Sequence, residues 1–279
     1  MNQVTDQQII EILRKEAVPA LGCTEPVACA LACAKCKEVL GGVPERLDVL
    51  VSGNIYKNGM GVGIPGTGMV GLPIAAALGA VCGKSEYGLE VLKEVNVGDN
   101  LQRAKDMLGQ VTVSLKEDAP DKLYAEALAT KGNDTVKVII AHTHTNIVLV
   151  EKNGEEIFKR EFRLDTSKPE DKGPELSVKR IWDFVHEVDV KDIEFVLQGA
   201  EMNKAISAEG LNSEYGLQIG KTLKENIDKG LLEDDLLNRT LIRATAASDA
   251  RMDGCPKPVM TNSGSGNQGI TVYLPVVVA

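Results

Sequence analysis

Two cysteines in this sequence occupy settings in which metal or cluster ligands are often found. Cys255 lies between a glycine and a proline and begins a run of small and amide residues that ends at Gly269. Such a run exposes backbone N–H groups with little side-chain bulk, which suits close approach to a carboxylate or an inorganic cluster. Cys23 follows a glycine and precedes an expected helix start, where the helix dipole favours thiolate over thiol. We therefore interpret both cysteines as candidate ligands.

The other four cysteines have a different setting. Cys29, Cys33 and Cys36 have the spacing of radical enzymes that bind an iron–sulfur cluster and S-adenosylmethionine. However, offsets of four and seven place all three on one face of an alanine-rich segment that strongly favours a helix. A buried cysteine packs as a small hydrophobic residue. The sequence thus favours core packing for these three and for Cys82, and disfavours radical chemistry.

A glycine-rich segment at 53–68 could surround an anion. Lys57 supplies a positive charge there and Asn58 supplies an amide. The order of residues matches neither a Rossmann fingerprint nor a P-loop. A purely structural glycine-rich turn is an almost equally strong interpretation.

His142 and His144 are expected to alternate on a strand and to point to one face. They could form half of a metal site, but no third ligand of the usual kind lies nearby in the sequence. Packing or hydrogen bonding is therefore the favoured interpretation for both.

Composition excludes several classes of function. The net charge of −9 over 279 residues argues against a nucleic-acid or membrane partner, because both require a basic surface. No leader is expected, since residues 2–8 are mainly polar, and no apolar run reaches the roughly 20 residues that span a bilayer. Six cysteines in a chain of this length are no disulfide scaffold. We expect a reducing, cytoplasmic compartment.

The hydrophobic pattern predicts an α+β fold in which a mainly helical part, 1–109 and 166–279, is built from both ends of the chain. An antiparallel β-meander at 110–165 is inserted between them. Residues 53–71 are predicted as a loop, Thr24 as a helix cap and 168–174 as a linker. We expect helices at 5–17, 24–40, 72–81, 98–108, 176–188, 192–208, 213–227 and 233–250, and strands at 46–52, 110–116, 123–130, 135–141, 146–152 and 156–162. The apolar run at 272–279 resembles part of a buried element, so we expect the helical part to be truncated at its carboxyl end.

Four motifs, at 22–28, 57–68, 141–146 and 255–269, give this chain its resemblance to the L-cysteine desulfidase family. That family is related to the alpha part of iron–sulfur L-serine dehydratases. The resemblance spans the whole chain, and its most specific part is the run that begins at Cys255.

The resemblance implies a [4Fe–4S] cluster held by three cysteines. Two of the family's ligand positions fall on Cys23 and Cys255, and the third is expected beyond residue 279, so this chain by itself need not be active. The implied reaction is a β-elimination that converts L-cysteine to sulfide, ammonia and pyruvate, with L-serine as the alternative substrate. The iron would act as a Lewis acid on the leaving group.

We expect the catalytic residues to be Lys57, Asn262 and Ser263, and the substrate-binding residues to be Asn58, Ser265, Asn267 and Gln268. The general base stays open among Lys57, Glu25 and His142.

Two further classes of function remain open at this point. One is a non-catalytic protein that binds a small molecule, and the other is a zinc protein that uses Cys23, Cys255 and a histidine. The expected partner is a small amino-acid substrate, and a homodimer remains open as its assembly.

Overall fold

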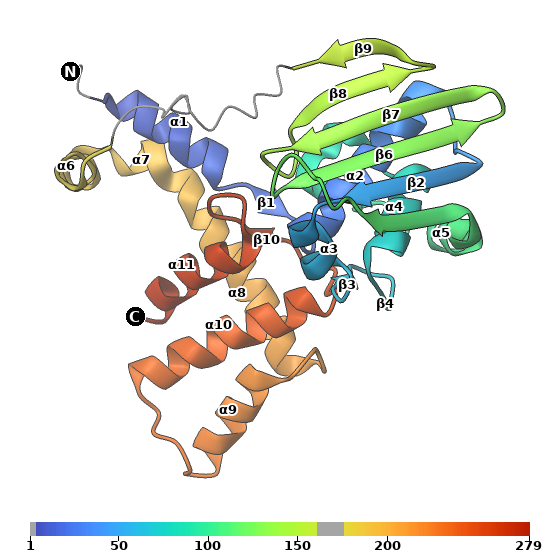
Figure 1. Cartoon of the computed structure of the whole chain (residues 1–279). Coiled ribbons are helices and arrows are strands. Elements are labelled where there is room, and N and C mark those ends of the chain that lie inside the picture. The colour runs from blue at the N-terminus through green and yellow to red at the C-terminus, as the bar shows by residue number, and fades with distance from the viewer. Residues whose placement is uncertain (1–3, 161–175) are drawn as a thin grey trace.

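The computed structural model describes residues 4–160 and 176–279, so the predicted linker at 168–174 lies outside the described residues. Its fold is α+β, as predicted (Figure 1). The helices are α1 (Asp6–Glu16), α2 (Thr24–Leu40), α3 (Gly53–Gly59), α4 (Leu72–Val81), α5 (Asn100–Met107), α6 (Val178–Glu187), α7 (Val190–Ile193), α8 (Leu197–Asn212), α9 (Ile219–Asp228), α10 (Leu236–Met252) and α11 (Gly266–Val278). The strands are β1 (Pro19–Ala20), β2 (Arg46–Val51), β3 (Gly63–Ile64), β4 (Met69–Val70), β5 (Val111–Leu115), β6 (Tyr124–Lys131), β7 (Asp134–Ala141), β8 (Ile147–Lys152), β9 (Glu155–Lys159) and β10 (Val259–Met260).

The main sheet has six strands in the order β5-β2-β6-β7-β8-β9. Strands β6 to β9 form an antiparallel meander, but the prediction that the strand at 110–116 also belongs to it is wrong, because β2 separates β5 from β6. Strand β2, from the amino-terminal part of the chain, lies between β5 and β6 and pairs in parallel with β5. The meander is therefore continuous with the amino-terminal part through β2, whereas the division into domains stays a prediction.

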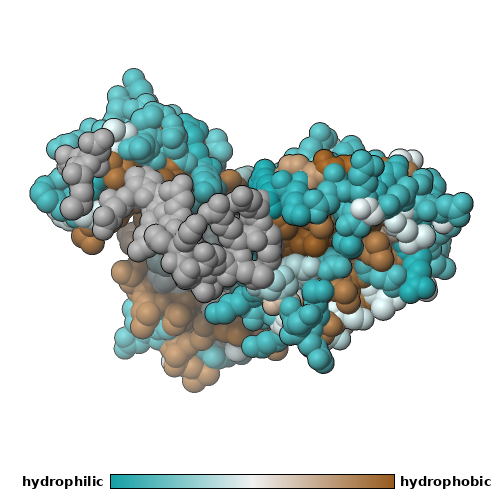
Figure 2. Space-filling view, turned by 45° about the horizontal axis from the view of Figure 1, so that its top comes forward, coloured by the Kyte–Doolittle hydropathy of each residue, from teal (hydrophilic) through white to brown (hydrophobic). Residues whose placement is uncertain are grey.

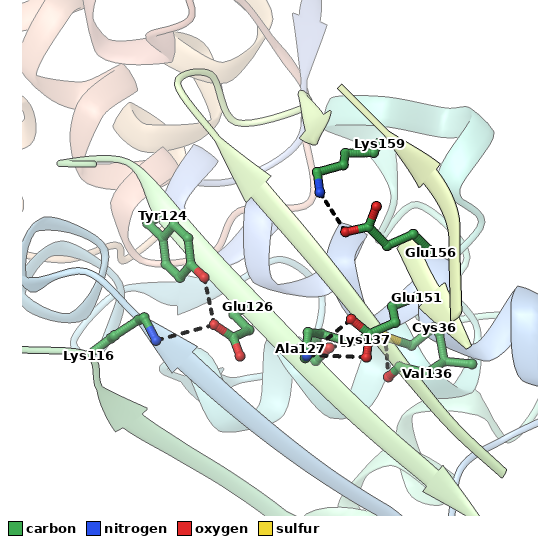
Figure 3. Close-up of polar contacts among 10 residues, drawn as sticks. All are labelled: Cys36, Lys116, Tyr124, Glu126, Ala127, Val136, Lys137, Glu151, Glu156 and Lys159. Atoms are coloured by element: carbon green, nitrogen blue, oxygen red, sulfur yellow. Dashed lines mark hydrogen bonds and ion pairs between the residues drawn. The ribbon is translucent and has the colours of Figure 1, made fainter. Parts of the chain in front are cut away.

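Helix α2 packs on one face of this sheet. The Sγ atom of Cys36 contacts the carbonyl oxygens of Ala127 at 3.5 Å and of Val136 at 3.6 Å (Figure 3). Cys29 and Cys33 are also fully buried, which confirms the predicted packing role of this stripe. Helix α4 lies close against α2, because Gly79 brings its backbone to that of Ala30 with no room for a Cβ atom.

The other face of the sheet is half-buried and carries polar side chains beside apolar ones such as Leu128 and Ile139. Lys137 pairs with Glu151 at 3.3 Å, and Glu126 accepts from both Lys116 and Tyr124 (Figure 3). The opposite charges in these ion pairs neutralise each other on this face of the sheet.

The carboxyl-terminal helices form a second core between α8, α10 and α11, with Ile206, Ala247 and Leu274 buried in it. Helix α11 buries only one side, since Val272 and Val276 are exposed. The apolar carboxyl-terminal run is thus a half-exposed helix instead of a buried element. Figure 2 shows hydrophobic side chains gathered on the lower left of the molecule, where these helices lie.

The prediction of a loop at residues 53–71 is wrong in part. It contains the short helix α3 and the two-stranded pairing of β3 with β4. The single helix predicted at 192–208 is also divided, because α7 and a 3₁₀ turn at 194–196 precede α8. In the described part of the chain, no helix is long and apolar enough to cross a bilayer.

Candidate functional site

The amino-terminus of α2 is the centre of the candidate site. Gly22 has a left-handed backbone with φ of 77°, and a Cβ atom there would lie 2.7 Å from Pro65. The turn places Cys23 at the N-cap, so the prediction that Thr24 caps this helix is wrong. The Cys23 side chain makes no capping hydrogen bond, and Cys23 is 7% exposed.

Cys23 donates a hydrogen bond to the carboxylate of Glu25, with 2.9 Å between Sγ and Oε2. Burial raises the pKa of Cys23 to about 11; the charge of Arg251 lowers it and that of Glu25 raises it. Burial is the largest of these effects and favours the thiol, whereas the sequence predicted that the helix dipole favours the thiolate.

Glu25 gathers polar groups from three elements. Burial alone raises the pKa of Glu25, but the hydrogen bond from Cys23, the nearby His144 and the amide of Asn58 together bring it below its ordinary value. Nδ2 of Asn58, on α3, lies 3.3 Å from Oε1 of Glu25. Asn58 was predicted to meet the substrate, and in this structure its amide is engaged by the protein.

Arg251, in the last turn of α10, is 3% exposed and joins two loops. Nη2 donates to the carbonyl oxygen of Gly22 at 3.0 Å, and Nη1 donates to Oδ1 of Asn267 at 2.8 Å. Nε is buried without a partner among the described residues. A Cβ atom at Gly266 would lie 2.5 Å from Nε, so only glycine fits against this guanidinium. Burial lowers the pKa of Arg251, while Cys23 and Glu25 oppose that change.

The prediction that one strand carries both histidines is wrong, because β7 ends at Ala141, before His142. His142 has a left-handed backbone with φ of 70°, and its Nδ1 lies 2.6 Å from Oδ2 of Asp121. His144 is half-buried. Burial lowers the pKa of His144; the charge of Glu25 raises it and that of Arg251 lowers it. The contact of His142 with Asp121 agrees with the hydrogen-bonding interpretation that the sequence favoured over a half metal site.

Cys255 is buried in the core of α8, α10 and α11. Burial raises its pKa, and hydrogen bonds from the backbone at Lys257 and from the hydroxyl of Tyr215 oppose this. The turn before it meets the β3 segment, since Gly66 donates to the carbonyl oxygen of Gly254 at 3.2 Å. Gly63 is needed there because a Cβ atom would lie 2.6 Å from the carbonyl oxygen of Asp253.

The segments of Cys23 and Cys255 thus meet the same β3 loop, although the two thiols have different hydrogen-bond partners. Among the described residues, no group of three His, Cys, Asp or Glu side chains is placed to hold a metal ion. Cys23 and Cys255 are both free. Thiols are the kind of group that ligates an iron–sulfur cluster, so these two residues fit such a cluster in their chemistry.

The loop after Cys255 is closed by backbone bonds between Asn262 and Ser265, and Ser263 at its tip has φ of 49°. Ser265 caps α11 by accepting from the backbone of Gln268 at 3.3 Å. Ser263 and Gln268 are exposed. Of the residues predicted in this loop, Ser265 and Asn267 therefore have structural partners, whereas Ser263 and Gln268 present their side chains to solvent.

The glycine-rich segment is closely packed at some of its glycines, whereas Gly53, Gly61 and Gly68 have open space beside them. A Cβ atom at Gly59 would collide with Leu72, and one at Gly66 would collide with Asn96. Lys57 is exposed on α3. These contacts favour a structural role in close packing for Gly59 and Gly66.

Comparison of the sequence with known proteins shows the family of this chain. The family model described as serine dehydratase alpha chain matches residues 86–279. The chain belongs to the serine dehydratase alpha chain family. The relation to the alpha chain of serine dehydratases that the motifs predicted is thus confirmed at the level of the family.

Relatives in the family are longer than this chain. The chain is 49% identical over 275 residues to a UPF0597 protein of Actinobacillus pleuropneumoniae serotype 3 (strain JL03), covering 98% of the chain and 63% of the relative. It is 49% identical over 278 residues to a UPF0597 protein of Dichelobacter nodosus (strain VCS1703A), covering 99% of the chain and 64% of the relative. The chain therefore spans a little under two thirds of these relatives. No solved structure matches it.

A cavity of about 580 Å³ lies away from this site, between α8, α9, α10 and α11. Most of its charged lining is paired within the protein, for example Arg239 with Asp234 and Lys224 with Asp228, whereas Arg243 has no ion pair among the described residues. An apolar floor that includes Ile242 and Leu274 offers no group for chemistry. The polar site at α2 is thus the better candidate in this member of the family.

Sequence reasoning missed Arg251 and Asn203. Arg251 continues the buried stripe of Ala246, Ala247 and Ala250 on α10, and a charged residue within such a stripe is the signal that could have identified it. Asn203, fully buried on α8, accepts from the N–H of Met260 at 2.9 Å and donates to its carbonyl oxygen at 3.3 Å. It holds β10, which leads into the 261–269 loop.

Proposed function

We propose that the protein is a lyase of amino-acid catabolism that eliminates the β-substituent of L-cysteine, releasing sulfide, ammonia and pyruvate. Membership of the serine dehydratase alpha chain family supports a lyase reaction on a small amino acid. L-serine, which loses water in place of hydrogen sulfide, is the alternative substrate. The motifs shared with the L-cysteine desulfidases favour L-cysteine.

The observation that carries this proposal is the polar cluster at the amino-terminus of α2. A thiol, a carboxylate and a buried guanidinium meet there, from Cys23, Glu25 and Arg251. Such charged groups are costly to bury unless they serve one another or a ligand. An amino acid is a zwitterion, so a carboxylate and nearby N–H donors suit its two charged ends.

The residues of the chain have separate roles in this proposal. Glu25 accepts from the substrate ammonium group, and the N–H of Thr24 at the start of α2 donates to the substrate carboxylate. Ser263 and Gln268, exposed in the 261–269 loop, close over the bound substrate. Arg251 positions both loops and does not itself need to touch substrate.

Cys23 and Cys255 are proposed as two ligands of a [4Fe–4S] cluster. When bound, the cluster supplies a Lewis acid for the departing thiolate. Both thiols must lose their protons to bind iron, and burial opposes this in the metal-free protein. We further propose a cytoplasmic location, which six cysteines without a disulfide support.

The test is anaerobic purification of the complete gene product, followed by iron and acid-labile sulfide analysis. Sulfide release from L-cysteine and pyruvate release from L-cysteine and L-serine are then measured. We expect iron, labile sulfide and turnover of L-cysteine with a higher kcat/KM than that of L-serine. The reverse ratio selects the serine dehydratase.

Two variants sharpen this test. Cys23→Ser should lose bound iron and all turnover. Cys82→Ser is the matched control, because Cys82 already contacts the carbonyl oxygen of Leu78 in its own helix at 3.3 Å, as a serine hydroxyl can. Zinc without labile sulfide would favour the zinc protein. A folded protein without metal or turnover would contradict the lyase and favour a small-molecule-binding role.

A further inference from the structure

The turn between β7 and β8, residues 141–146, has an unusual backbone. His142 has φ of 70°, a left-handed conformation that is uncommon for a residue with a side chain. Its N–H donates to the carbonyl oxygen of Leu123 at 3.2 Å, and the N–H of Thr143 donates to that of Ala141 at 2.9 Å. Contacts from outside the turn must stabilise such a conformation.

Side chains from two other segments supply those contacts. Nδ1 of His142 lies 2.6 Å from Oδ2 of Asp121, and the other oxygen of Asp121 accepts from the N–H of Leu123 at 3.2 Å. At the far end of the turn, Oδ1 of Asn146 accepts from Nη1 of Arg160 at 2.8 Å. The turn is therefore fixed at both ends.

His144 lies between these two anchors. It is half-buried and within electrostatic reach of both Glu25 and Arg251. The sheet thus reaches the amino-terminus of α2 through this turn.

We propose that Asp121 and His142 form a positioning pair that holds His144 beside Glu25 in the candidate site. The pair acts through the conformation of the turn, so neither residue needs to touch the substrate. The placement of His144 stands on the geometry of the turn. Its contribution to turnover rests on the proposed lyase function.

The chain has three histidines, which makes the placement measurable. Their ring protons can be followed by NMR as the pH is changed, with His144→Gln and His186→Gln to assign the signals. In the native protein the surroundings of His144 hold its pKa below the ordinary value. Asp121→Ala and His142→Gly both remove the pair, and glycine keeps the left-handed backbone without strain.

We expect the titration of His144 to move toward the ordinary histidine value in both variants, because its ring leaves the buried position. Asp118→Ala is the control, since Asp118 is an exposed acidic residue in the same loop. It should leave the titration unchanged. An unaltered His144 titration in both Asp121→Ala and His142→Gly would overturn the proposal.

Kinetics of the complete gene product give the second readout. Loss of the pair should lower kcat for L-cysteine about tenfold or more with little change in KM, because a displaced group loses its orientation. His144→Gln should have a similar effect, and adding Asp121→Ala to it should lower kcat no further. Additive losses would contradict a role through His144. If the native protein turns over neither amino acid, the proposed function fails, and the NMR comparison still decides the positioning role.

Discussion

Nη2 of Arg251 donates to the carbonyl oxygen of Gly22, which lies 3.0 Å away and 229 residues earlier in the chain. The same guanidinium donates through Nη1 to Asn267 at the start of α11. One buried side chain therefore connects the amino-termini of α2 and α11, the two places from which the site is built. Arginine suits this role because its planar group presents donors in fixed directions.

Arg251→Met is expected to destabilise the protein by about 2–5 kcal/mol, since it leaves buried acceptors at Gly22 and Asn267 without donors. Urea unfolding measures this change. Arg251→Lys should recover only part of the loss, because an ammonium group cannot reach both acceptors in the same geometry.

Arg239 on the same helix provides the control for this experiment. Its ion pair with Asp234 is exposed, so Arg239→Met should leave the unfolding curve unchanged. Equal effects of the two methionine variants would show that the link from Arg251 to Gly22 does not support the fold.

Local patterns predicted the elements, whereas long-range contacts decided how they meet. The burial of Cys29, Cys33 and Cys36 follows from their place in an alanine-rich, apolar segment, and the end of α2 follows from Gly41, which has φ of 74°. The position of β2 between β5 and β6 has no such signal, because strand pairing depends on residues about 80 apart, such as Val49 and Ala127. Periodicity cannot report a pairing of that kind.

The candidate site likewise combines residues that the sequence identified with contacts that only the structure shows. The sequence identified Cys23, Asn58 and Asn267 as chemically suited residues, and the structure brings them into one polar cluster with Glu25 and Arg251. It did not reveal that Asn58 and Asn267 bind protein groups, since their partners lie on other elements. Their proposed roles toward substrate stay predictions.

The contact between Gly63 and the Asp253 backbone allows a test of the junction beneath both cysteines. Gly63→Ala is expected to cost about 1–3 kcal/mol of stability, because the added methyl group meets backbone atoms that cannot rotate away. Gly61, two residues earlier, has open space around it, so Gly61→Ala should be neutral or stabilise by less than about 1 kcal/mol. Thermal unfolding of the two variants side by side measures this. Equal behaviour would contradict the close approach.

Asn203 provides a third prediction, because its side-chain amide makes both backbone bonds of Met260. Asn203→Ala leaves a buried N–H and a buried carbonyl without partners, which should cost about 2–3 kcal/mol in urea unfolding. The loop that follows Met260 should also loosen, so Cys255 should react faster with a thiol reagent. Asn212→Ala, at the exposed end of the same helix, is the control and should change neither quantity. Unchanged thiol reactivity in Asn203→Ala would show that β10 holds its place without this amide.

The buried stripe on α2 predicts a loss of stability in alkali. Burial raises the pKa of Cys29 from 9.0 to about 12, so the folded state keeps the thiol protonated after the unfolded state has begun to lose its proton. This contribution is fully present below pH 9 and is lost as the pH rises from 9 toward 12. Over the first pH unit or two above pH 9 the loss is on the order of 1–2 kcal/mol for this one group. Cys29→Ala should be less stable at neutral pH, because it leaves a small cavity, but its unfolding free energy should fall less steeply above pH 9.

Val27→Ala removes buried volume from the same helix without removing a titrating group, so its unfolding free energy should fall with pH as steeply as that of the wild type. Urea unfolding at a series of pH values compares the three proteins, and parallel curves for Cys29→Ala and the wild type would show that this thiol titrates normally in the folded state.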